Sequence, residues 1–180
     1  HTIGVSFNPY VVATTGTDRG FDRFDFVSGT ELVREAGVTS LLSFLRHLRT
    51  FSGGLAPDKQ KHTPDFLLNQ IVKDRLRSSV DREEPIFLAA HYYGAHHPDY
   101  PSPVFREEFA SELPTSPAEA ARSAFAQSTN VYEQIAGGLE DEADREVMRT
   151  MYDAQVRQVD ALVSRLVAFL EEIEIADETI

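Results

Sequence analysis

The sequence predicts a helix-rich α/β fold, and three observations support this prediction. Residues 2–8 and 85–92 have the composition of β-strands. Apolar residues recur at helical spacing in several longer segments, most clearly over residues 145–172. The run from Ile86 to Tyr92 is continuously apolar, which is typical of a strand covered on both faces. Such strands belong mainly to parallel sheets packed between helices, so we expect that arrangement here.

The amino-terminal segment HTIGVSFNPYVV is rich in strand-forming residues and ends at the turn signal Asn8-Pro9. Gly16 and Gly20 then bracket a polar stretch that leads into GFDRFDFV. We expect an irregular loop in this region, held in place by Phe21 and Phe24.

About five helices are predicted, among them segments over residues 30–51, 64–80, 117–135 and 145–172. Thr63 and Pro64 supply an N-cap and a first-turn proline for the second helix. Ser116, Pro117 and Glu119 have the spacing of a capping box, which predicts the start of the third helix. The apolar residues of the last helix repeat at intervals of three and four, as a helix with one buried face requires.

The charge balance restricts the partners of the chain. Its 180 residues carry 17 basic and 29 acidic side chains, a net charge of −12, which disfavours nucleic acid and anionic membranes. Most of the basic residues are arginine, and an acidic, lysine-poor surface suits the salty cytoplasm of a halophile. No apolar run approaches the roughly 20 residues of a membrane span. A cytoplasmic location is therefore favoured, and the oligomeric state stays open.

The chain contains no cysteine, which excludes disulfides, thiolate metal sites and thiol nucleophiles within it. It begins inside one strand-like segment and ends where another strand is due. We therefore expect residues 1–180 to be a single partial domain from a longer protein.

The segment LAAHYYGAHHPDYPSP places three histidines where a predicted strand gives way to a proline-rich loop. In open α/β sheets, ligands bind beyond the carboxyl ends of the strands, where His96 and His97 are expected. An imidazole there can bind an anion, act as a general acid or ligate a metal, or the pair can be loop residues without a task. His91, within the strand, is expected to be a core residue with a hydrogen-bond partner. We expect Gly94 to allow the turn and Tyr100 to serve in packing.

Three segments, in this order, resemble motifs of the sulfatase family in the alkaline phosphatase superfamily. PIFLAAHYYGAHHPDYPSP resembles the family's buried strand followed by His-x-Pro, an aromatic residue and more prolines. GFDRFDFV resembles its Gly-Phe-Asp-x-Phe signature, and MYDAQVRQVDALVSRLVAFLEE is similar to its tyrosine-aspartate helix. The resemblance covers nearly the whole chain, from Thr2 to Ile180. It implies the central portion of a three-layer α/β/α catalytic domain.

The resemblance also implies an activity. Sulfatases hydrolyse sulfate esters with a formylglycine nucleophile beside a calcium or magnesium ion held by carboxylates. The histidine of His-x-Pro corresponds to His96, which would contact the sulfate and protonate the leaving alcohol as the catalytic residue. His97, at the variable position, and Asn8, after the first strand, are candidate substrate-binding residues. The implied substrate is a small-molecule or carbohydrate sulfate ester.

The chain also departs from the family pattern. It lacks the nucleophile motif and the metal-binding aspartates, so we expect no metal ligands here and no activity from this segment alone. Where many sulfatases have Gly-Lys-Trp-His, this chain has Gly4-Val5-Ser6-Phe7, so two sulfate contacts are lost or replaced. Two alternatives therefore stay open. One is a phosphodiester or phosphonate monoester hydrolase of the same superfamily, and the other is a non-catalytic anion- or carbohydrate-binding relative.

Overall fold

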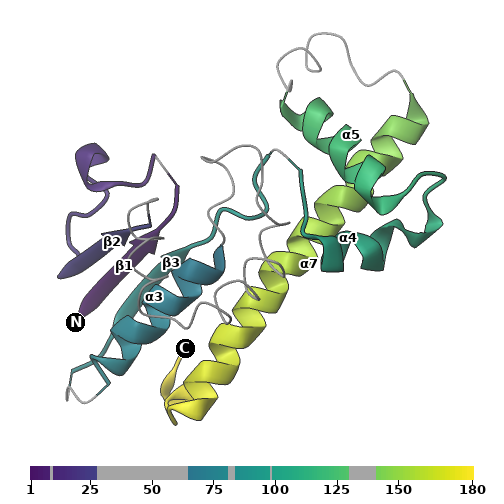
Figure 1. The fold of residues 1–180 in the computed structure, drawn as a ribbon. Coiled ribbons are helices and arrows are strands. Elements are labelled where there is room, and N and C mark those ends of the chain that lie inside the picture. The colour runs from purple at the N-terminus through teal and green to yellow at the C-terminus, as the bar shows by residue number, and fades with distance from the viewer. Residues whose placement is uncertain (9, 28–64, 81–83, 98, 130–140) are drawn as a thin grey trace, which may run out of the picture. The chain divides into compact units, whose positions relative to one another are not determined.

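The computed structural model describes residues 1–8, 10–27, 65–80, 84–97, 99–129 and 141–180. The described residues form a mixed α/β structure with four α-helices and a three-stranded parallel sheet (Figure 1), which confirms the predicted α/β class. The chain divides into two compact units. The first unit comprises His1–Leu41, Thr63–Tyr93 and Ala161–Ile180, and the second comprises Leu42–His62 and Gly94–Asp160.

The sheet belongs to the first unit and has the strand order β2-β1-β3. Its strands are β1 (Thr2–Ser6), β2 (Arg23–Phe26) and β3 (Phe87–His91). Both pairings are parallel, and the register places Ser6 opposite His91 at the carboxyl ends of β1 and β3. The strands expected near residues 2–8 and 85–92 are thus present, each a little shorter than predicted.

Strand β2 corrects the prediction of an irregular loop after Gly20. The sequence RFDF alternates polar and apolar residues with the period of a strand, a signal that the flanking glycines obscured. Phe21 and Phe24 do pack together, with ring centroids 5.7 Å apart. Phe24 lies over Gly4 of β1, where a Cβ atom would approach its ring carbon Cδ2 to 2.5 Å. Glycine at position 4 therefore makes room for an aromatic residue that covers one face of β1.

Helix α3 (Asp65–Arg77) contacts β1 and supplies much of the core of this unit. Its buried apolar residues recur at helical spacing and comprise Leu68, Ile71, Val72 and Leu76. The helix lies within the predicted range of 64–80, whereas its expected cap at Thr63-Pro64 and the helix expected over 30–51 fall outside the described residues.

The prediction that β3 is covered on both faces is wrong for the described part of the chain. Phe87 is 59% exposed and His91 is also exposed, while the residues between them are half-buried. Strand β3 forms one edge of the three described strands, with β1 as its only hydrogen-bonded neighbour among them. A continuous apolar run does not by itself distinguish such a strand from a central one.

The second unit contains α4 (Pro103–Phe109), α5 (Pro117–Thr129) and the amino-terminal part of α7 (Glu142–Glu172). Alanines dominate its core, and the cluster comprises Ala110, Ala120, Ala121, Ala124, Val147 and Met151. The predicted capping box is confirmed: the Glu119 peptide N–H donates to Ser116 Oγ, and the Ser116 N–H donates to Glu119 Oε2. Helix α4, a short helix with Pro103 in its first turn, was not predicted from the sequence.

The long helix predicted over 145–172 is confirmed as α7. One face is buried through Met151, Leu162 and Phe169, whereas four apolar side chains on another face are exposed: Tyr152, Val156, Val163 and Val167. No helix in the described ranges combines the length and apolarity needed to cross a membrane.

The close approach at Gly4 gives a stability prediction. Gly4→Ala should lower the free energy of unfolding by about 1–3 kcal/mol, because the new methyl group displaces the Phe24 ring. Urea denaturation of Gly4→Ala, Phe24→Leu and the double variant forms a mutant cycle. If the Phe24 ring is the obstacle, the double variant loses less stability than the sum of the two single losses. Additive losses would show that Gly4 is required for another reason.

Candidate functional site

The two candidate histidines lie in a loop of the second unit, described over residues 94–97 and 99–102, which we call the histidine loop. His96 and His97 are both exposed, and their rings meet edge to face with centroids 6.2 Å apart. His96 Nδ1 lies 2.8 Å from the His97 carbonyl oxygen. A carbonyl can only accept, so His96 Nδ1 is the donor in this contact. A fixed tautomer of this kind suits a histidine that transfers protons.

Gln155 of α7 forms hydrogen bonds with both ends of the histidine loop. Its Nε2 donates to the Gly94 carbonyl at 2.7 Å, and its Oε1 accepts the Tyr100 peptide N–H at 2.7 Å. Both atoms of one buried amide are therefore used to close a stretch of seven residues that contains both histidines. Gly94 was expected to act through its backbone freedom, but its φ is not positive. Its carbonyl instead anchors the loop.

Two further buried side chains bind the same backbone. Gln158 Oε1, one helical turn beyond Gln155, accepts the Ser102 N–H at 2.9 Å. Ser128 Oγ of α5 accepts the Asp99 N–H at 2.7 Å and donates to the Ala124 carbonyl at 2.6 Å. The loop backbone is thus held from two helices, which limits the conformations available to the imidazoles.

Asp99 places a buried carboxylate next to the exposed His97. Its side chain is 1% exposed, and Oδ1 lies 3.2 Å from His97 Nδ1. The separation is that of an ion pair. Burial raises the pKa of Asp99, and the charges of His97 and His96 offset part of that rise.

Tyr100 packs as expected from the sequence. Its ring meets Phe125 edge to face with centroids 5.7 Å apart, and it lies against the core cluster of the second unit. The Arg106 guanidinium lies 5.7 Å from the centroid of the same ring. These contacts fix the carboxyl-terminal side of the histidine loop through an aromatic side chain.

His91 is not the core residue that the sequence analysis predicted. Its side chain is exposed at the carboxyl end of β3, because β3 lacks a covering layer there within the described ranges. The expected partner is present, since His91 Nδ1 lies 3.4 Å from Ser6 Oγ. Ser6 Oγ also accepts the Asn8 N–H at 3.1 Å.

Asn8 follows β1 in the first unit. Its side-chain carbonyl accepts the Tyr10 N–H at 2.9 Å, and its backbone carbonyl accepts the Val11 N–H. These are the contacts of an Asx turn, which accounts for the end of the strand. A substrate contact through Asn8 stays a prediction, as do the roles of His96 and His97.

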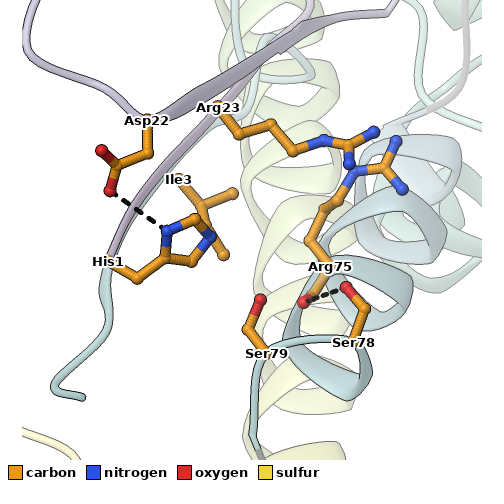
Figure 2. A pocket seen from close by; sticks show the side chains of 7 residues that line it. All are labelled: His1, Ile3, Asp22, Arg23, Arg75, Ser78 and Ser79. Atoms are coloured by element: carbon orange, nitrogen blue, oxygen red, sulfur yellow. Dashed lines mark hydrogen bonds and ion pairs between the residues drawn. The ribbon is translucent and has the colours of Figure 1, made fainter. Parts of the chain in front are cut away.

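A cavity of about 300 Å³ lies elsewhere in the first unit, at the amino-terminal edge of the sheet (Figure 2). Its lining comprises His1, Ile3, Asp22, Arg23, Arg75, Ser78 and Ser79. Both guanidinium groups already bind Asp25, Arg75 through bonds of 2.7 and 3.1 Å and Arg23 through one of 3.0 Å. Burial of Asp25 opposes its ionisation, but these hydrogen bonds prevail and lower its pKa.

The position of this cavity does not suit an anionic ester. Ser78 and Ser79 follow the carboxyl end of α3, where the helix dipole is negative. Ligand sites of parallel sheets also lie at the opposite edge, beyond the carboxyl ends of the strands. We therefore assign the arginines a structural role in joining α3 to β2.

No group of three or more histidine and carboxylate side chains in the described ranges could hold a metal ion. The calcium or magnesium ion implied by the resemblance thus has no ligand set among these residues. Comparisons with family models, curated proteins and solved structures gave no match to this chain.

The side chains that support the histidine loop were not predicted from the sequence. Gln155 and Gln158 interrupt the apolar stripe of α7 between Met151 and Leu162, at positions that share its buried face. Amides at buried helical positions need hydrogen-bond partners, so this interruption was a usable signal. Asp99 and Ser128 gave no comparable signal, because their burial depends on tertiary packing.

The two hydrogen bonds of the Gln155 side chain give the second stability prediction. Gln155→Met keeps the volume but leaves the Gly94 carbonyl and the Tyr100 N–H without a partner. It should lower the free energy of unfolding by about 2–4 kcal/mol in urea denaturation. Gln127→Met is the matched control, because Gln127 bonds only within α5 and its Oε1 has no partner in the described residues. A loss of unfolding free energy in Gln155→Met no larger than that in the control would show that these two hydrogen bonds do not hold the loop.

Proposed function

We propose that this chain is the central portion of a sulfatase-like hydrolase, within a three-layer α/β/α catalytic domain. The proposed substrate is a small-molecule or carbohydrate ester of sulfate. The proposal rests on the sequence resemblance together with one structural observation, the histidine loop. Two exposed imidazoles stand on a backbone that Gln155, Gln158 and Ser128 hold through buried hydrogen bonds.

Such a loop is suited to acid–base chemistry on an anionic ester. Expelling an alkoxide is costly, and a positioned acid typically accelerates such a step by 10²–10⁴-fold. In the proposed enzyme, His96 Nε2 carries the proton that the leaving oxygen receives, while Nδ1 stays bound to the His97 carbonyl. His97 and Asn8 are the further proposed contacts to the substrate.

The proposed nucleophile and metal come from outside this chain. A formylglycine would supply the nucleophile, and a calcium or magnesium ion would neutralise charge on the sulfate. The described residues offer no ligand set for that ion, so no role in holding it is proposed for them. Their part is to present the histidines and to fix their orientation.

His96→Ala in the full-length protein tests this proposal. The kcat for an aryl sulfate should fall by roughly 10²-fold or more, because the leaving oxygen loses its proton donor. The free energy of unfolding should change by less than about 1 kcal/mol, since an exposed loop side chain contributes little packing.

The matched control is His91→Ala, which removes another exposed histidine and should leave kcat within about threefold. Full activity of His96→Ala would remove the assigned acid. If the unsubstituted protein hydrolyses no aryl sulfate in the presence of calcium or magnesium, the proposed function itself is wrong.

A further inference from the structure

Helix α7 has a second apolar face, on the side of the helix away from its buried residues. The four side chains of this face are between 41% and 48% exposed and comprise Tyr152, Val156, Val163 and Val167. They follow one another at intervals of four, seven and four residues, so they lie in one row along the helix. We call this row the α7 stripe. A contiguous row of exposed apolar side chains marks a candidate interaction surface.

The spacing of the α7 stripe is the same in both directions along the helix. Helix α7 is continuous from Glu142 to Glu172, so helical geometry fixes the order of the four side chains. A second α7 laid antiparallel on the first places Val156 of each copy opposite Val163 of the other. The same pairing places Tyr152 opposite Val167. The stripe is therefore complementary to itself about a twofold axis, which is the requirement for an isologous dimer.

Charged residues at the ends of the α7 stripe fit the same arrangement. Arg149 precedes the stripe and Glu171 follows it, and both side chains are exposed. Antiparallel pairing brings Arg149 of one copy beside Glu171 of the other, whereas parallel pairing would place each charge beside its own copy. Asp160 meets its own copy at the centre of the antiparallel pair, but its ion pair with Arg157 offsets that charge. The end charges thus favour the antiparallel arrangement.

We infer that the α7 stripe is a homodimer interface, on which a second copy of this protein packs with its own α7 antiparallel to the first. The inference goes beyond the proposed function and does not depend on it, since no residue of the histidine loop takes part. A net charge of −12 on each chain opposes association, and the interface is small. We therefore expect a dissociation constant on the order of 10 µM rather than a permanent dimer.

Sedimentation velocity of the full-length protein over a concentration series tests this inference. The unsubstituted protein should pass from monomer to dimer as its concentration rises. Val163→Glu should weaken dimerisation roughly 10-fold or more, because it places an unpaired charge inside the interface. Ala168→Glu is the matched control, since it adds the same charge at an exposed position of α7 outside the stripe. It should leave the dissociation constant within about twofold.

Charge reversal distinguishes pairing between two copies from the binding of another partner. Arg149→Glu and Glu171→Arg should each weaken dimerisation about 3- to 10-fold, and the double variant should regain the affinity because the two charges exchange places. Both side chains are exposed, so these variants should remain folded. A protein that stays monomeric at every concentration, as it would if another segment of a longer chain covered the stripe, would overturn the inference. So would a dimer that is insensitive to Val163→Glu, or a double variant that regains no affinity.

Discussion

The organisation of the second unit depends on satisfying the buried backbone of the histidine loop. A peptide group that leaves water must find a hydrogen-bond partner, and an irregular loop cannot supply its own. Gln155 solves this for both ends of the loop with one amide, since it binds the Gly94 carbonyl and the Tyr100 N–H. The same hydrogen bonds that remove the cost of unsatisfied peptide groups also fix the positions of the imidazoles. Stability and orientation of the candidate site therefore have a common origin.

This constraint explains why α7 departs from a simple amphipathic pattern. Its buried face alternates between apolar side chains, such as Met151 and Leu162, and the two glutamines that bind the loop. In the first unit the same principle recurs with Asn69 of α3, which donates to the Leu162 carbonyl and accepts the Tyr92 hydroxyl proton. Buried amides thus link helices to neighbouring chain segments in each unit.

The sequence predicted those features that depend on local chemistry. The α/β class, two strands, the capping box at Ser116 and the long helix α7 follow from periodicity and capping signals, which act over a few residues. Strand β2 was missed because glycine-rich flanks suggested a loop. The exposure of His91 depends on which layers cover β3, and a single sequence does not encode that locally. The supporting residues of the site were missed for the same reason, since Asp99 and Ser128 meet only through the tertiary fold.

Amide hydrogen exchange of the histidine loop tests the central claim most directly. The Tyr100 and Ser102 N–H groups donate to buried glutamines, so their exchange should be slowed to the level of the buried amides of α7. Protection of Tyr100 and Ser102 comparable to that at Met151 and Ala154 is the predicted result. Exchange of both amides at the rate of an unstructured peptide would show that the glutamines do not hold the loop, and the account of the site would then fail.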